Sequence, residues 1–184
     1  IDNYAVSNFN KNIKKIIYPI GNFNLMKGIE FAIKAWNTKT HEYELHITVS
    51  EKQAQKEHLE LYNLAKNNKN ICFIGNIKNL NKKLFKWDAL LLTSLSEGFP
   101  KVLIESIINK VPIISTPTAG EFLLDNKHYL EVPFGDFKNI IDKIDLLNDN
   151  KKLRTNIINN AFDHISSYPD TTKQITHILQ KIRL

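Results

Sequence analysis

Residues 88–116 read DALLLTSLSEGFPKVLIESIINKVPIIST, and they contain the repeating unit from which the rest of the fold can be predicted. The apolar runs at 88–94 and 111–116 are typical of parallel strands that are buried on both faces. The segment between them, 100–110, has helical spacing, and Pro100 suits the first helical position because its missing N–H does no harm there. A strand, a helix and a second strand in this order predict a right-handed parallel crossover.

Short apolar or alternating runs and amphipathic segments continue to alternate on both sides of this unit. We expect further strands at 16–21, 44–50, 71–75 and 128–132, and helices at 26–37, 51–67, 79–87, 121–124, 137–147, 150–166 and 170–183. Strands that alternate with helices through short connections form parallel sheets with helices on both faces. The sequence therefore predicts an α/β fold, a Rossmann-like doubly wound parallel sheet of about six strands.

Composition and charge limit the classes of function. The chain has 184 residues with a formal net charge of +6, which is compatible with nucleic acid, an anionic membrane surface or a phosphate-bearing ligand. The lysines are scattered among asparagines, and no run combines basic with aromatic residues, so we expect no nucleic-acid role. The histidines show no metal-ligand spacing, so no metal site is expected.

The expected compartment follows from the cysteine content and the hydropathy pattern. The single cysteine, Cys72, cannot form an internal disulfide, which favours a reducing compartment. No run approaches the roughly 18 consecutive apolar residues that a membrane-spanning helix needs. We therefore expect a cytoplasmic protein.

Ligands bind doubly wound sheets outside the carboxyl ends of the strands, so the loops there hold the candidate site. Glu97 lies in the loop before the helix at 100–110, and Glu105 lies about one and a half turns inside that helix. Two carboxylates so placed can face one crevice at different depths, and they suit sugar hydroxyls because carboxylates only accept hydrogen bonds. The free N–H groups of the helix start favour an anion beside them. Alternatively, Glu97 is an ordinary helix-start acid and Glu105 a surface residue.

Two other loops at the same edge contain glycine. Lys27 ends the segment GNFNLMK between a strand and a helix, where a cation can reach a phosphate. The glycine spacing there matches neither a Walker A loop nor a dinucleotide-binding fingerprint, so taken alone Lys27 reads more simply as a solvated surface residue. Gly120, in TPTAGE, permits close backbone approach to a ligand or is an ordinary turn glycine.

Together these loops resemble the nucleotide-sugar-binding half of family 4 retaining glycosyltransferases, which have the two-domain GT-B fold. The family's E-x7-E signature is present as Glu97 to Glu105, and its G-R-L-x-x-x-K-G loop corresponds to 21–28. Three shorter motifs follow in the family's order: an F-x-G strand end at 73–75, a Gly-Glu pair at 120–121 and a Val-Pro-x-x-Asp turn at 132–136. The resemblance runs from about residue 15 to the end of the chain.

The resemblance implies a role for each matching residue. Glu97, near the donor sugar, and Lys27, as the diphosphate cation, would be the catalytic residues, while Glu105 would hold the ribose hydroxyls. The backbone around Asn76 and Ile77 would meet the base. The other residues expected to line the donor are Gly21, Asn22, Gly75, Gly98, Phe99, Pro100 and Gly120.

One position departs from the family pattern. The family's arginine in the first loop is Asn22 here. Arginine offers a permanent, bidentate charge to a diphosphate, whereas asparagine offers only an amide. Either Lys27 and the helix start carry the charge alone, or another lysine substitutes, or donor affinity is reduced.

The resemblance implies a retaining hexosyltransferase of polysaccharide biosynthesis. Its donor would be a UDP- or GDP-linked sugar, its acceptor a glycan or a lipid-linked sugar, and it would need no cofactor. Residues 1–14 would be a lead-in, 15–184 the donor-binding domain, and 170–183 a helix crossing back to an N-terminal domain that this chain lacks and that activity requires.

Two other functions are compatible with the same motifs. One is a nucleotide-sugar epimerase of GT-B architecture, and the other is a degenerate, non-catalytic module that binds nucleotide sugars. Peripheral, electrostatic contact with the inner face of a membrane is also left open by the basic surface.

Overall fold

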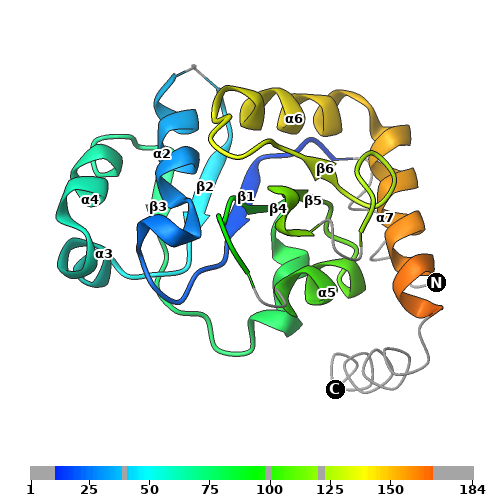
Figure 1. The fold of residues 1–184 in the computed structure, drawn as a ribbon, viewed down its shortest axis with the longest axis horizontal. Coiled ribbons are helices and arrows are strands. Elements are labelled where there is room, and N and C mark those ends of the chain that lie inside the picture. Colours follow the sequence, from blue (N-terminus) through cyan, green and yellow to red (C-terminus); the bar gives the residue numbers. More distant parts are fainter. Residues whose placement is uncertain (1–10, 39–40, 98–100, 120–122, 168–184) are drawn as a thin grey trace.

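The computed structural model describes residues 11–38, 41–97, 101–119 and 123–167. Its strands are β1 (Lys15–Tyr18), β2 (Glu44–Ile47), β3 (Ile71–Phe73), β4 (Ala89–Leu92), β5 (Ile113–Ser115) and β6 (Leu130–Glu131). Its helices are α2 (Ile29–Thr38), α3 (Glu51–Glu57), α4 (Leu59–Ala65), α5 (Lys101–Ile108), α6 (Lys138–Asp149) and α7 (Lys151–Ser166). Strands and helices alternate along the chain, as expected (Figure 1).

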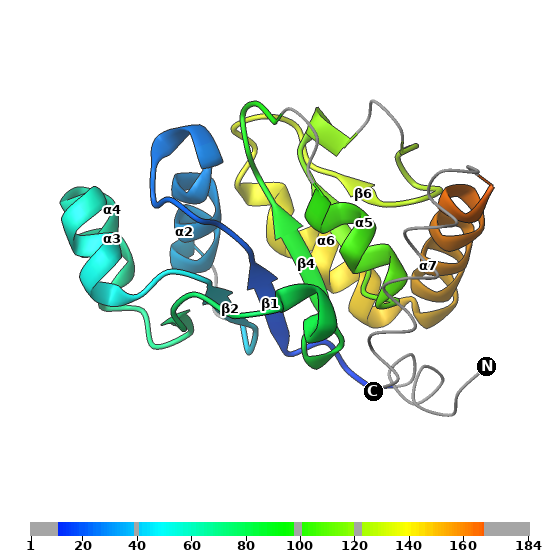
Figure 2. The same ribbon diagram turned by 90° about the horizontal axis from the view of Figure 1, so that it is seen from below.

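The strands form one parallel sheet of six in the order β3-β2-β1-β4-β5-β6. Helices α2, α3, α4 and α6 pack on one face of the sheet, and α5 packs on the other (Figures 1 and 2). Helix α7 contributes to both apolar clusters, with Ile157 in the first and Ala161 and Ile165 in the second. The chain reverses its direction of travel across the sheet between β1 and β4. This topological switch is where doubly wound sheets open a crevice for ligands.

Strand β4 shows why both faces must be covered. All four of its residues are buried. Leu91 joins the apolar cluster under α2 and α6, whereas Leu90 and Leu92 join the cluster under α5 and α7. Because successive side chains of a strand point to opposite faces, a continuous apolar run needs helices on both sides. The predicted doubly wound fold is thereby confirmed.

Two of the expected helices, at 51–67 and at 79–87, are each replaced by two shorter elements. The segment 51–67 forms α3 and α4 rather than one helix, because His58 leaves the helical conformation (φ −156°, ψ 88°). Its Nδ1 atom accepts the N–H of Leu61 and caps the second helix. The segment 79–87 forms two 3-10 turns, η2 (Leu80–Lys82) and η3 (Leu84–Lys86), instead of one helix.

The expected short helix at 121–124 is wrong for the part that the structure describes. Leu123 and Leu124 are not helical, and the Leu124 N–H donates to Nδ1 of His128 instead of to a helical carbonyl. A 3-10 turn, η4 (Pro117–Ala119), precedes them. The expected helix at 170–183 lies outside the described residues.

The turn that links β1 to α2 is locked against the end of β4. After the 3-10 turn η1 (Leu25–Lys27), Gly28 adopts φ +66°, and a Cβ atom there would lie 1.8 Å from the carbonyl oxygen of Thr93. The buried Tyr18 hydroxyl donates to the Lys27 carbonyl and lies 2.6 Å from Thr93 Oγ1, which donates to the Gly28 carbonyl at 2.7 Å. Burial raises the pKa of Tyr18, so its hydroxyl stays protonated.

Gly28→Ala tests this packing. The new Cβ would both overlap the Thr93 carbonyl and strain a left-handed backbone, so we expect a loss of about 3 kcal/mol or more in unfolding free energy, measured by urea denaturation. Gly21→Ala is the control, because nothing lies within 4 Å of its Cβ position. An unchanged midpoint for Gly28→Ala would contradict the packing described here.

A buried histidine joins α7 to the segment before β6. The ring of His128, which is 2% exposed, stacks on His164 at a centroid distance of 4.3 Å. Burial, together with His164 and Lys127, lowers the pKa of His128 to about 4. The folded chain therefore holds this imidazole neutral under conditions in which an unfolded chain would protonate it.

This pKa difference predicts a pH-dependent stability. Between the unfolded pKa of about 6.5 and the folded pKa of about 4, the unfolded chain binds the extra proton, so the unfolding free energy falls as the pH is lowered through that window. In His128→Gln, which keeps an acceptor for the Leu124 N–H, urea denaturation between about pH 7 and pH 5 should show a smaller loss. Equal losses in both proteins would exclude His128 as the source.

Candidate functional site

A pocket of about 360 Å³ opens at the carboxyl edge of the sheet, beside the topological switch. Its lining comes from the loop after β1, the end of β2, the loop after β3 and the first turns of α5. The lining residues are Pro19, Ile20, Gly21, Thr48, Asn76, Ile77, Leu80, Lys101, Val102 and Glu105. Four residues singled out in the sequence therefore meet in one pocket: Gly21, Asn76, Ile77 and Glu105.

Glu105 presents an available carboxylate to this pocket. The residue is partly buried on α5, and among the described residues its carboxylate makes no hydrogen bond or ion pair. Burial raises the pKa of Glu105, and the positive charge of Lys101, one turn earlier, offsets part of that effect. A carboxylate that only accepts hydrogen bonds, held at the edge of a pocket, suits a ligand with adjacent hydroxyls.

Glu97 and Lys27 form a second centre, apart from the pocket lining. Lys27 Nζ lies 3.0 Å from Oε1 and 3.2 Å from Oε2 of Glu97, and the Ser94 hydroxyl also donates to Oε1. The side chain of Lys27 is 31% exposed and that of Glu97 is 16% exposed. The Leu95 N–H donates to the Met26 carbonyl at 3.0 Å, so the loops that carry this ion pair are also joined through their backbones.

The structure therefore places the two acids of the E-x7-E signature in different surroundings. Glu105 lines the pocket, whereas Glu97 is engaged by Lys27 above the end of β4. Asn22 is exposed and is not among the residues that line the pocket. Gly75 adopts φ +73° and donates its N–H to the Val49 carbonyl, which directs the following residues to the pocket.

Four expected site residues cannot be placed. Gly98, Phe99, Pro100 and Gly120 lie outside the described residues. The anion site expected at the start of α5 would use the N–H groups of Phe99, Lys101 and Val102, and because Phe99 is one of these four residues the site stays a prediction.

Two supporting residues escaped the sequence analysis. The Thr48 hydroxyl donates to the Ile20 carbonyl and accepts the Ile20 N–H, which fixes the floor of the pocket between β1 and β2. Glu57 of α3 accepts the Phe23 N–H, and this bond lowers the pKa of its carboxyl. Thr48 fell inside the strand expected at 44–50, which in the structure ends at Ile47, and no sequence signal marked Glu57.

Within the described ranges, no three histidine, cysteine or acidic side chains are grouped so that they could hold a metal ion. None of the described helices combines the length and the apolar character that crossing a bilayer requires.

Comparison with known sequences identifies relatives. The model of the family described as "Glycosyl transferases group 1" matches residues 2–164. A Campylobacter jejuni enzyme is 30% identical over 112 residues, which are 59% of this chain and 30% of that protein. It is described as a GalNAc-alpha-(1->4)-GalNAc-alpha-(1->3)-diNAcBac-PP-undecaprenol alpha-1,4-N-acetyl-D-galactosaminyltransferase.

Solved structures share the fold. Anabaena Alr3699/HepE, in complex with UDP and glucose, has a TM-score of 0.74 at 15% identity over 92% of this chain and 48% of its own. The C-terminal domain of a glycosyl transferase group 1 family protein (LpcC) from Francisella tularensis has a TM-score of 0.67 at 24% identity, over 89% of this chain and 90% of its own.

The chain thus spans less than half the length of the Campylobacter and Anabaena proteins. Its six-stranded parallel sheet with flanking helices is the Rossmann-like architecture of GT-B glycosyltransferases. Because the family model covers nearly the whole described chain, this protein belongs to the glycosyl transferases group 1 family.

Proposed function

We propose that this chain is the donor-binding domain of a retaining glycosyltransferase that uses a nucleoside-diphosphate sugar. The observation that carries the proposal is the pocket in which Gly21, Asn76, Ile77 and Glu105 converge from three separate parts of the chain. Its volume of about 360 Å³ lies within the range of small-molecule sites. UDP in the Anabaena neighbour supports a nucleotide as the ligand class.

The pocket provides a separate contact for each part of a nucleoside. The backbone at Asn76 and Ile77 would meet the edge of the base. The Glu105 carboxylate would accept hydrogen bonds from the two ribose hydroxyls, because it lines the pocket and makes no hydrogen bond or ion pair among the described residues. The diphosphate would extend from the ribose toward the carboxyl edge of the sheet, where the first turn of α5 and the loop after β1 lie.

Glu97 and Lys27 are proposed as the catalytic residues at the sugar end. During transfer the bond between the anomeric carbon and a diphosphate oxygen breaks, and negative charge grows on the diphosphate. The anomeric carbon bonds to an acceptor hydroxyl oxygen, and the proton of that hydroxyl passes to the leaving diphosphate oxygen. A cation fixed nearby stabilises that charge without rearranging. The ion pair with Glu97 holds Lys27 in such a position. We propose that Glu97 faces the sugar. Retention of configuration would follow because the acceptor attacks the face that the diphosphate leaves.

The remaining partners are also proposals. We propose an acceptor that is a glycan or a lipid-linked sugar, which the undecaprenol-linked substrate in the description of the Campylobacter relative supports. Transfer would require a second domain, since the chain spans less than half of that relative. The net charge of +6 supports peripheral contact with the cytoplasmic face of a membrane, where the acceptor would be met.

Glu105→Gln tests the assignment of the ribose site. Calorimetric titration of the chain with UDP and with GDP should show binding of one of them. The variant should lose about 1.5–3 kcal/mol of binding free energy, roughly 10- to 150-fold in affinity. Glu60→Gln, on the exposed face of α4, removes the same charge away from the pocket and should have no effect. Unchanged affinity in Glu105→Gln would remove this residue from the site.

The raised pKa of Glu105 predicts a pH dependence. Uridine is the suitable probe, because it carries no phosphate that titrates in the same range. Lowering the pH should protonate Glu105 at a higher pH than an exposed glutamate, which titrates near 4.3, and should weaken uridine binding. An NMR titration series should show this loss in the wild type and a flat profile in Glu105→Gln, and a flat profile in both would oppose the ribose assignment.

A further inference from the structure

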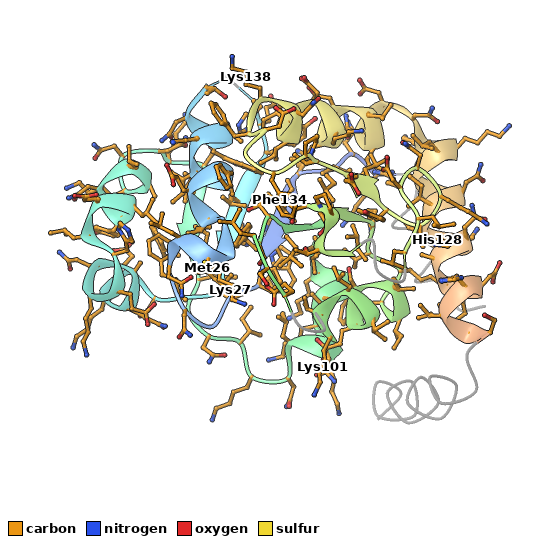
Figure 3. All side chains as sticks on the ribbon, in the orientation of Figure 1. Met26, Lys27, Lys101, His128, Phe134 and Lys138 are labelled. Carbon is orange, nitrogen blue, oxygen red and sulfur yellow. The ribbon has the colours of Figure 1, made fainter. Side chains whose placement is uncertain are left out.

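Lys101 is the basic residue that lines the pocket. It is the first residue of α5, it is exposed, and among the lining residues that the structure describes it is the only cation. In that same part of the chain its side chain has no ion pair or hydrogen bond, so its charge is not neutralised by contact. Figure 3 shows Lys101 at the start of α5, on a different element from Lys27.

The positive charge of Lys27 is already paired with the carboxylate of Glu97. Both carboxylate oxygens of Glu97 lie within 3.2 Å of its ammonium group. The Lys27–Glu97 pair has no net charge, so it attracts an approaching anion weakly. To bind Lys27 directly, the anion would have to separate two partly buried charges and leave Glu97 without its cation. The cost of separating such a pair reduces what Lys27 can contribute to binding a diphosphate in the ground state.

Asn22 does not replace the missing charge. It is uncharged and exposed, and it does not line the pocket. The loop after β1 therefore brings one cation to this edge of the sheet, and that cation is the paired Lys27. A diphosphate bound here would need a positive charge from another element.

Lys101 and Glu105 lie on the same face of α5. Residues four apart on a helix lie on the same face, with a rise of about 6 Å between them. A nucleoside whose ribose hydroxyls contact Glu105 and whose base lies at Asn76 and Ile77 would direct its phosphate chain along the helix axis toward Lys101. The mutual influence of the two side chains appears in the partial offset that Lys101 exerts on the pKa of Glu105.

We propose that Lys101 is the principal cation that binds the diphosphate of the donor in this protein, in place of a charge in the loop after β1. The inference rests on the proposed function and deepens it by assigning the diphosphate contact. Lys27 is then left to act on the charge that develops during transfer, beside Glu97.

The test compares, on the whole chain, the nucleoside diphosphate that binds with its own nucleoside: UDP with uridine or, if GDP is the one that binds, GDP with guanosine in the same way. Lys101→Met should weaken UDP binding by about tenfold or more at low salt and leave uridine binding unchanged, because only UDP carries the diphosphate. It should also flatten the salt dependence of UDP affinity. Lys101→Arg should restore most of the affinity. Lys138→Met removes the same charge from an exposed residue of α6 on the other side of the molecule, and it should change the binding of neither ligand (Figure 3).

The outcomes separate this inference from the function on which it rests. If Glu105→Gln loses UDP but Lys101→Met binds UDP as the wild type does, the inference fails and the proposed function stands. Equal weakening of UDP and uridine by Lys101→Met would also overturn it, since that pattern indicates a damaged pocket. If the folded wild type binds neither UDP nor GDP, both proposals fail.

Discussion

The contact between Gly28 and the carbonyl of Thr93 is the constraint on which the carboxyl edge of this sheet depends. It brings the loop after β1 onto the end of β4, closer than any side chain would allow. The Tyr18 hydroxyl contacts both sides of this junction, because it donates to the Lys27 carbonyl and lies beside Thr93 Oγ1. With this junction fixed, Lys27 has a defined position beside Glu97.

The site that results separates two kinds of charge. At one centre Lys27 and Glu97 hold each other in a partly buried ion pair, so their geometry is rigid and their net charge is zero. At the other, Glu105 and Lys101 share one face of α5, line a pocket and have no such partners among the described residues. The first arrangement suits a step in which charge develops, and the second suits binding of a ligand with hydroxyls and phosphate.

Much of the fold could be predicted from the sequence, because β4 and β5 are short, mostly apolar strands that are buried along their whole length, as in a parallel sheet with both faces covered. The division of 51–67 could not be predicted, since it depends on one backbone conformation at His58. The pairing of Lys27 with Glu97 joins residues 70 positions apart, so no local pattern shows it. The sequence alone does not show which lysine would replace the charge of the missing arginine, and only the pocket lining singles out Lys101.

A crystal structure of this chain with bound UDP would test the account most directly. We predict density for the nucleotide in the pocket at the carboxyl edge, with the ribose hydroxyls on Glu105, the base against Asn76 and Ile77, and the diphosphate beside Lys101. UDP bound instead in the larger pocket at the opposite edge of the sheet, which Trp36 and Asn68 help to line, would contradict it.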